Sequence, residues 1–398
     1  MKLRLLDLLA CPGCGHPRLE LTSFWLDRES QPPEVMAGVL RCPPCGRSYP
    51  VVDGIPRFLP DSWEEHGDRL APYLGGAEAA AGAVEEVAAF RAEHDATRKS
   101  FGFEWLRYQV TGDPENRRFF RRSTGFDAAE LRGRLVLDAG CGMGRFTKVA
   151  AELGAEAVGM DLSRSVERAF RENRRPDVHF VQGDIMRPPF AAGTFDHAFS
   201  IGVLHHTPDT RRAFRSLVPL LRPGGRIAIW VYRSFQPEVA VGVHKRAFAR
   251  LCQWVSDGTR AVTTRLPHRL LHLLCYAAVP VGWVKRQVGR RPLLRHLLWP
   301  LMLPPVSDHP DWRVRLCDTF DWLSPRYQWK HTTREVREWF EAEGLTGVRA
   351  LDKAVSVTGT RPAAAAPAGD RRRAAPAGEG ARARLAIPVP APAAEASR

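Results

Sequence analysis

Two Cys-x-x-Cys pairs lie close to the N-terminus, and a glycine follows each pair. Four thiolates in two such turns match the closed tetrahedral ligand set of a structural zinc site, which leaves no coordination position open for chemistry. Glycine suits a tight metal-binding turn because it adopts backbone angles that other residues avoid. A redox dithiol is the alternative interpretation. We therefore expect Zn²⁺ to be bound by Cys11, Cys14, Cys42 and Cys45.

A second pattern with chemical meaning is the glycine-rich run LDAGCGMGRF at residues 137–146. Glycines let a backbone approach a ligand closely, and the N-terminus of the expected following helix offers free N–H groups to a carboxylate or phosphate. Dinucleotide-binding loops use a related spacing, but Arg145 stands where their third glycine would be. The loop residues that could contact a ligand are Asp138, Gly140, Cys141, Gly142 and Gly144.

Acidic residues end two further expected strands. Asp161, followed by Leu162, stands where a carboxylate can accept both ribose hydroxyls of a bound nucleoside. Asp184, followed by Ile185, stands where an acid can accept from an adenine amino group. These positions indicate a nucleoside-containing ligand.

The residues between 131 and 232 alternate in a way that predicts a parallel α/β sheet. Expected strands cover residues 134–137, 157–160, 178–181, 195–201 and 226–231. Expected helices cover residues 145–153, 164–173 and 209–221, and a tight turn ends at Gly225. Much later, residues 332–343 predict a helix with Thr332 or Thr333 as N-cap, followed by two closing strands at 348–351 and 354–357.

In this order, DAGCGMG, GMD, GDI, SIGVLHHTPD and LRPGG resemble the class I S-adenosylmethionine-dependent methyltransferases, close to the type 11 group. The resemblance is strong over residues 131–232 and extends to 326–360 by topology. It implies a Rossmann-like fold whose seven-stranded sheet has an antiparallel last strand. It also implies that S-adenosyl-L-methionine is held by Asp138, Gly140, Cys141, Gly142 and Gly144 (methionine part), Asp161 with Leu162 (ribose), Asp184 with Ile185 (adenine), and Ser200 with Ile201 (flanking the sulfonium).

Two adjacent histidines, His205 and His206, follow the fourth expected strand. They lie at the carboxyl edge of the sheet, where ligands bind in open α/β folds. A sulfonium is already a good leaving group, so methyl transfer needs mainly proximity and orientation. If the acceptor must lose a proton, either imidazole could act as the catalytic base. The alternative is a packing or capping role at the start of the next helix.

The segment around the cysteines, from LLDLLACPGC to YPVVDGIPRFLP, resembles the small zinc-ribbon protein that activates eukaryotic and archaeal tRNA, rRNA and release-factor methyltransferases. The match covers about residues 3–60. Here the module is fused to a catalytic domain. We expect it to cover part of that domain or to help position substrate, and to carry no chemistry.

These features predict six regions. They are a zinc-ribbon module (1–60), a helical connector that could cover the cofactor (61–130), the methyltransferase core (131–232), a helical basic and apolar insert serving as a substrate cap (233–325), the end of the core (326–360) and a disordered Ala/Pro/Arg-rich tail (361–398). In the connector, Phe101, Phe103 and Trp105 alternate, which would place them on one side of an extended segment.

The formal net charge is +14, and residues 235–310 hold eleven Lys and Arg against three Asp and Glu. This insert could cap a hydrophobic substrate, make peripheral contact with an anionic membrane, bind nucleic acid, or be a helical subdomain with a solvated basic face. The N-terminus lacks a signal-peptide pattern, and no run reaches the roughly 18 apolar residues of a membrane span. A cytoplasmic protein is therefore expected.

We expect an S-adenosylmethionine-dependent methyltransferase that acts on a small-molecule or lipid-like acceptor. The alternatives are an rRNA or tRNA methyltransferase, which the basic charge favours, and a non-catalytic cofactor-binding adaptor. Against RNA, the positive charge lies among apolar side chains, and residues 200–203 read SIGV in place of the Asn/Asp-Pro-Pro-Tyr/Phe pattern used on adenine or glutamine nitrogens. The intact glycine loop and strand-end acids argue against an adaptor.

Overall fold

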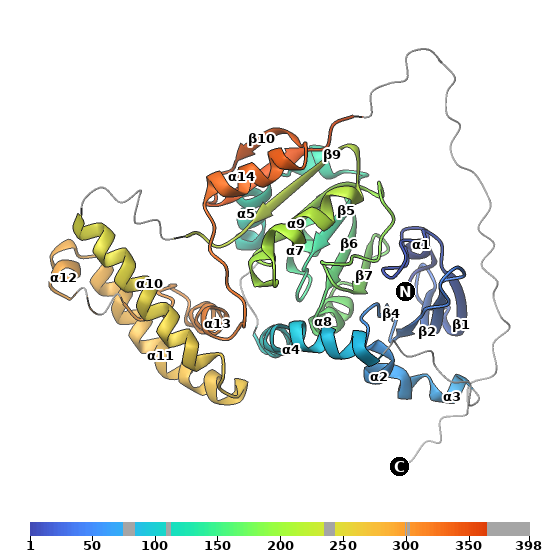
Figure 1. Cartoon of the computed structure of the whole chain (residues 1–398), viewed down its shortest axis with the longest axis horizontal. Helices are drawn as coiled ribbons and strands as arrows, with labels where there is room; N and C mark the ends of the chain where they lie inside the picture. Colours follow the sequence, from blue (N-terminus) through green and yellow to red (C-terminus); the bar gives the residue numbers. More distant parts are fainter. Residues whose placement is uncertain (75–83, 109–112, 235–242, 299, 301–302, 364–398) are drawn as a thin grey trace.

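The computed structural model describes residues 1–74, 84–108, 113–234, 243–298, 300 and 303–363 (Figure 1). Apart from residues 361–363, the tail that was expected to be disordered lies outside these residues. The larger sheet has seven strands in the order β10-β11-β9-β8-β5-β6-β7. They are β5 (Leu135–Ala139), β6 (Glu156–Asp161), β7 (Val178–Gln182), β8 (Phe195–Ile201), β9 (Leu221–Trp230), β10 (Thr346–Ala350) and β11 (Ser356–Thr360).

The strand directions confirm the predicted fold class. Strands β5 to β9 run parallel to one another. Strand β11, the last strand among the described residues, pairs antiparallel with both β9 and β10. This is a Rossmann-like sheet with one reversed strand. The described helices of this part are α4 (Val84–Arg107), α5 (Asp113–Thr124), α6 (Ala128–Leu131), α7 (Arg145–Glu152), α8 (Ser165–Glu172), α9 (Thr210–Leu217) and α14 (Thr333–Ala342), with 3₁₀ turns at Leu204–His206 and Val218–Leu220.

Side chains that alternate along β5 divide the core into two layers. Leu135 and Leu137 join an apolar cluster with residues of α9 and α14, whereas Val136 joins a cluster with residues of α5, α7 and α8. Helices therefore cover both faces of the sheet, as parallel strands require. Helix α14 begins at a capping box, in which Thr332 accepts from the Glu335 N–H at 3.0 Å, and this confirms the predicted N-cap.

The expected strands and helices between 131 and 220 are present, with boundaries moved by one or two residues. The LRPGG segment was predicted to be a turn that precedes the strand. It instead belongs to the strand, because β9 begins at Leu221. Phe195 pairs with Leu221 and His197 with Arg226, so residues 222–225 bulge out of the strand. Gly224 accommodates the bulge with a φ of 82°.

The N-terminal module is a four-stranded antiparallel sheet with a short helix, and it packs against the β7 edge of the large sheet (Figure 1). Arg57 is fully buried there and donates to the Gln182 side chain at 3.0 Å, while the Phe58 N–H donates to the Gln182 carbonyl at 2.9 Å. Module residues share one apolar cluster with the sheet. Its elements are α1 (Leu3–Leu6), β1 (Glu20–Asp27), β2 (Glu34–Arg41), β3 (Ser48–Val52) and β4 (Ile55–Pro56).

The connector is helical, and the prediction of an extended segment at residues 101–105 was wrong, because these residues belong to α4. Helical spacing instead places Phe101 and Trp105 toward one cavity, while Phe103 packs against Phe320, with ring centroids 5.4 Å apart. The remaining elements of the connector and insert are α2 (Ser62–His66), a 3₁₀ turn (Gly67–Arg69), α3 (Ala71–Leu74), α10 (Val243–Thr263), α11 (His268–Gly289), α12 (Pro292–Leu297) and α13 (Trp312–Leu323). Among the described helices, none combines the length and apolar character needed to cross a membrane.

Candidate functional site

A cavity of about 1310 Å³ opens at the carboxyl ends of β5, β6 and β8. One wall comes from the glycine-rich loop and the strand ends, and the other from α4, α13 and the insert. The predicted residues that line it are Gly140, Cys141, Gly142, Asp161, Leu162, Asp184, Ile185, Ile201 and His206. The fold thus brings together residues that are distant in sequence, on the sheet edge where open α/β folds bind ligands.

The glycine-rich loop wraps tightly over the end of β5. Gly140 has a φ of 90°, and a Cβ there would lie 2.4 Å from the Val203 side chain. The N–H groups of Gly140 and Cys141 both donate to the Met160 carbonyl, at 2.7 and 2.9 Å. Any side chain at position 140 would therefore clash with Val203 and displace the loop, which would break these two hydrogen bonds to β6. This rigid loop leaves the first turn of α7 facing the cavity.

Asp161 holds the loop from the end of β6. Its Oδ2 accepts from the Gly142 N–H at 2.8 Å, and its Oδ1 accepts from the N–H of Ser163 at 2.8 Å and from the Ser163 hydroxyl at 2.7 Å. Burial raises the pKa of Asp161, but these donors stabilise the charged form. Because Oδ1 is already crowded with donors, Oδ2 is the oxygen better placed to accept from a ligand hydroxyl.

Asp184 lines the cavity next to α4. Its Oδ1 accepts from the Met186 N–H at 2.8 Å, and its Oδ2 lies 3.7 Å from Nε2 of His94. Burial raises the pKa of this carboxyl, while His94 acts in the opposite direction. The sequence analysis did not single out His94, whose position on α4 became apparent only in the folded chain.

Three of the residues predicted to hold the cofactor, Asp138, Gly144 and Ser200, do not line the cavity. Asp138 is buried and accepts from the Thr147 hydroxyl at 2.6 Å, and burial raises its pKa to about 7. The Ser200 hydroxyl donates to the Ala139 carbonyl at 2.7 Å. These two contacts tie the loop to α7 and β8. We therefore propose that Asp138 and Ser200 position the loop from beneath.

The two histidines lie in different surroundings. His205 is fully buried, does not line the cavity, and neither of its ring nitrogens has a hydrogen-bond partner among the described residues. His206 lines the cavity and its Nδ1 lies 2.8 Å from the Tyr327 carbonyl, so Nδ1 carries the proton and Nε2 is left as the acceptor. Nε2 has no hydrogen-bond partner in the part of the chain that the structure describes, and it lies 3.8 Å from Oδ1 of Asp321. Burial lowers the pKa of His206 to about 3.

Buried acids on the opposite wall were missed by the sequence analysis. Asp318 and Asp321 are one helical turn apart on α13, and Glu104 comes from α4. Burial raises the pKa of Asp318 and of Asp321 to about 6, and Tyr232 donates a hydrogen bond to Asp321. One oxygen of Glu104 is buried and has no hydrogen-bond partner within the described ranges. The i, i+3 spacing of two acids in a strongly basic region was the available signal.

Arg145, the first residue of α7, also lines this part of the cavity. Its guanidinium lies 5.3 Å from the centroid of the Trp105 ring and 4.4 Å from that of Phe146. The acids near it partly offset the effect of burial, which lowers its pKa. The cavity therefore combines an aromatic wall, cationic side chains and several carboxyl groups.

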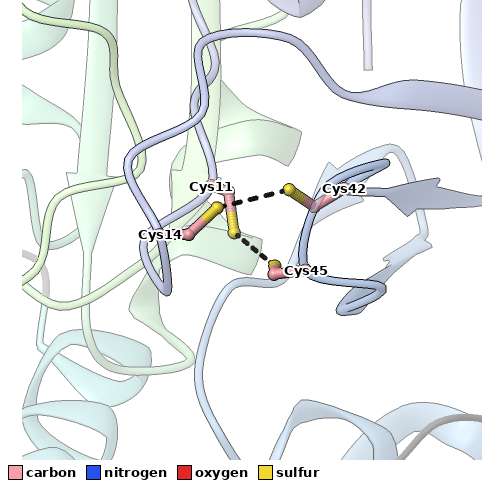
Figure 2. Close-up of side chains that lie close together, drawn as sticks. All are labelled: Cys11, Cys14, Cys42 and Cys45. Atoms are coloured by element: carbon pink, nitrogen blue, oxygen red, sulfur yellow. Dashed lines mark hydrogen bonds between the residues drawn. The ribbon is translucent and has the colours of Figure 1, made fainter.

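The four cysteines of the N-terminal module come together as predicted. Their Sγ atoms all lie within 4.8 Å of one another, with 3.6 Å between Cys11 and Cys45 and 3.5 Å between Cys14 and Cys42 (Figure 2). Gly15 and Gly46 close the two turns with positive φ, and each N–H donates to the carbonyl of the first cysteine of its pair, at 2.8 and 2.9 Å. This arrangement could hold one metal ion between the two turns.

Comparison with known proteins matches two parts of the chain to protein families. Residues 137–229 match the family model described as a methyltransferase domain, and residues 2–54 match the Trm112p-like protein family. Both matches confirm the family resemblances found in the sequence. The two models together leave the connector, the insert, residues 326–360 and the tail unmatched.

Two curated relatives each match just over a quarter of this chain. Methyltransferase GfsG of Streptomyces halstedii is 35% identical over 119 residues, covering 28% of this chain and 43% of GfsG. Sterol 24-C-methyltransferase ERG6 of Saccharomyces cerevisiae is 30% identical over 111 residues, covering 26% of this chain and 29% of ERG6. The chain therefore spans less than half the length of either relative.

One solved structure aligns with more than half of this chain. It is the complex between the Haloferax volcanii Trm112 methyltransferase activator and a methyltransferase, and the alignment covers 68% of this chain and 99% of that chain. The sequence identity is 14% and the TM-score 0.38.

Proposed function

We propose that this chain, which joins a Trm112p-like module to a methyltransferase domain, is an S-adenosylmethionine-dependent methyltransferase acting on a small-molecule or lipid-like acceptor. The observation that carries the proposal is the single cavity that joins the glycine loop and the strand-end acids to the pair His206 and Asp321. One wall can hold a nucleoside cofactor. The other presents acid and base groups to an acceptor.

The donors and acceptors along the first wall support an assignment of the cofactor. Asp184 and Ile185 would face the adenine, Oδ2 of Asp161 the ribose, and residues 140–145 the methionine part, where Arg145 offers a cation to a carboxylate. Ile201 would lie near the sulfonium. S-adenosylmethionine supplies an activated methyl group, and these residues hold it in one orientation.

His206 is the candidate general base. As the methyl carbon bonds to the acceptor atom and its bond to sulfur breaks, a proton on that atom would pass to Nε2 of His206. Asp321, 3.8 Å away, would then stabilise the imidazolium. An acceptor that has no proton to lose would need only the positioning.

The apolar wall of the cavity favours a lipid-like acceptor. Residues from the insert and α13 add Leu303, Pro304 and Val314 to the ring of Trp105. A relative of the methyltransferase domain is named for a sterol. RNA is the competing acceptor, because the family of the N-terminal module resembles an activator of tRNA and rRNA methyltransferases.

Glutamine at position 206 is expected to lower kcat by roughly 10²–10⁴-fold while the dissociation constant for S-adenosylmethionine stays within about threefold. The matched variant is His205→Gln, which removes a neighbouring imidazole that does not face the cavity. That change should lower the melting temperature, and it should lower kcat less than His206→Gln does. Equal loss of kcat in both variants would show that the imidazole of His206 has no special role.

The rate is also expected to depend on pH through Asp321. Its pKa of about 6 means that the carboxylate able to stabilise an imidazolium is present above pH 6 and is lost as the pH falls through that value. A profile of kcat between pH 5 and 8 should therefore decline on the acid side, with a midpoint of about 6. The Asp321→Asn variant should lack this limb. Its persistence in Asp321→Asn would assign the titration to another group.

We also propose that Cys11, Cys14, Cys42 and Cys45 bind Zn²⁺. The four-sulfur set and its separations suit a tetrahedral ion with no open position. The module would then act through structure, because its segment at residues 8–10 contacts the loop that follows β7. The Ala10 N–H donates to the Pro189 carbonyl at 3.0 Å, only a few residues beyond Asp184.

A further inference from the structure

The large apolar side chains that remain exposed in the described part of the chain concentrate in the helical insert. Twelve of eighteen lie between residues 243 and 298. Trp254 is 74% exposed, Leu293 73% and Leu273 64%. Single exposed apolar residues are ordinary, but a concentration of this kind on three consecutive helices marks an interaction surface.

Helix α11 carries apolar residues on two of its sides. Leu271, Cys275 and Gly282 are buried, and the first two pack in one cluster with residues of α13. The other face holds Leu270, Leu273, Leu274, Val281 and Val284, which repeat at helical spacing and are all exposed. A helix that needed only to pack on the core would carry polar residues there. The second apolar face therefore lacks a partner among the described residues.

Positive charge surrounds this apolar face. Residues 243–298 contain eleven Lys and Arg, and Asp257 is the one acidic residue in that stretch of sequence. Arg265 and Arg269 lie at the start of α11, and Arg290 and Arg291 follow its end, all exposed. Cations therefore stand at both ends of the apolar stripe.

Aromatic side chains complete the pattern. Trp283 is 55% exposed and Tyr276 46% exposed on α11, and Trp254 extends from α10. Indole and phenol rings favour the boundary between water and hydrocarbon, because they combine an apolar body with a polar group. Arg and Lys beside them match the negative headgroups of an anionic lipid layer.

We propose that the exposed faces of α10, α11 and α12 form a docking surface for an anionic lipid bilayer. In this docked state the apolar stripe of α11 enters the boundary between headgroups and acyl chains, and the flanking arginines contact lipid phosphates. A second copy of the chain is a poorer partner, since two surfaces of this charge would repel each other. A nucleic acid would leave the apolar stripe uncovered.

The inner sides of the same helices line the cavity. Cys252 and Ser256 belong to α10 and Lys285 to α11. Docking would therefore bring the acceptor side of the cavity close to the bilayer. This last link rests on the proposed function, whereas the docking itself does not, so a vesicle assay without any methyl acceptor tests it separately.

The test is flotation of the full chain with phosphatidylcholine vesicles that contain phosphatidylglycerol, compared with phosphatidylcholine alone. The chain should float with the anionic vesicles, and added salt should weaken the association. The double variant Leu273→Glu with Trp283→Glu should bind at least about tenfold more weakly. The matched control is Trp25→Glu, in which an equally exposed tryptophan of β1 (52% against 55%) is replaced, and it should float like the unmodified chain.

A second pair of variants tests the charges. Replacing Arg290 and Arg291 with glutamine should weaken binding by about fivefold for each arginine, whereas Arg334→Gln, on the exposed side of α14, should leave it unchanged. Calorimetric binding of S-adenosylmethionine by each variant shows that the fold survives. No flotation with anionic vesicles would overturn the proposal. So would an equal loss in Trp25→Glu, or a vesicle-free dimer that Leu273→Glu with Trp283→Glu dissolves.

Discussion

Serine in place of Cys42 is expected to lower the melting temperature of the whole chain by more than about 10 °C, because one of the four proposed metal ligands is lost. Cys42 is fully buried between the two turns. The effect should reach the methyltransferase domain, since both parts share one apolar cluster and the buried Arg57 bonds to Gln182 of β7. Scanning calorimetry and the loss of S-adenosylmethionine binding measure the effect.

The matched control is Cys275→Ser, which replaces an equally buried thiol on α11 that lies outside the four-cysteine cluster. It should cost only about 1–3 kcal/mol of the free energy of unfolding. A zinc chelator should destabilise the unmodified chain and Cys275→Ser, and should have no further effect on Cys42→Ser. Two separate melting transitions, with the second unaffected by Cys42→Ser, would contradict a shared core.

Alanine in place of Asp161 is expected to weaken S-adenosylmethionine binding by at least about 100-fold. The substitution removes the proposed acceptor for the ribose hydroxyls. It also removes the partner of the Gly142 N–H and of Ser163, so the glycine loop loses its tie to β6. Titration calorimetry with S-adenosylmethionine and with S-adenosylhomocysteine gives the affinity.

The control for this prediction is Asp177→Ala. Asp177 precedes β7 at the opposite edge of the sheet and pairs with Arg175 at 3.0 Å. Its removal should leave cofactor affinity within about twofold, as is usual for a surface ion pair. If Asp161→Ala bound the cofactor as tightly as Asp177→Ala, the cofactor would have to lie elsewhere.

Fusion to the methyltransferase domain gives the Trm112p-like module a defined position. Its chain runs beside the loop that follows β7, where Ala10 donates to Pro189 and the Ala191 N–H donates to the Leu8 carbonyl at 3.2 Å. Asp184 lies at the start of that loop and lines the cavity. A stable module would thus hold the adenine end of the site in place without contacting the ligand.

The wall formed by the glycine-rich loop and the strand ends could be predicted from the sequence, because its residues lie at or just after strand ends in local patterns. The alternation of strands and helices fixes which ends of the strands meet, so the sequence alone places Asp161 and Asp184 at one edge of the sheet. The cysteine cluster was predictable for the same reason, since its spacing is local. The sequence pattern did not indicate which of these side chains face the cavity. Asp138 and Ser200 are buried and do not line it.

The acceptor wall could not be predicted in this way. Glu104 and Asp321 are more than two hundred positions apart, and only the packing of α4 against α13 brings them to one cavity. The prediction that Phe101 to Trp105 form an extended segment was wrong. Apolar residues two positions apart also occur in a helix when its different sides pack against different neighbours. Likewise, the exposed stripe of α11 resembles a buried helix in sequence, since apolar periodicity does not show which face is covered.

The account is tested most directly by following the methyl group. The full chain is incubated with methyl-tritiated S-adenosylmethionine and an extract of the cells that make the protein, and the products are separated into RNA, protein, and a fraction of lipids and small molecules. The account predicts label in the lipid and small-molecule fraction, with none transferred by the Asp161→Ala variant. Label in RNA alone, or transfer that persists in Asp161→Ala, would contradict it.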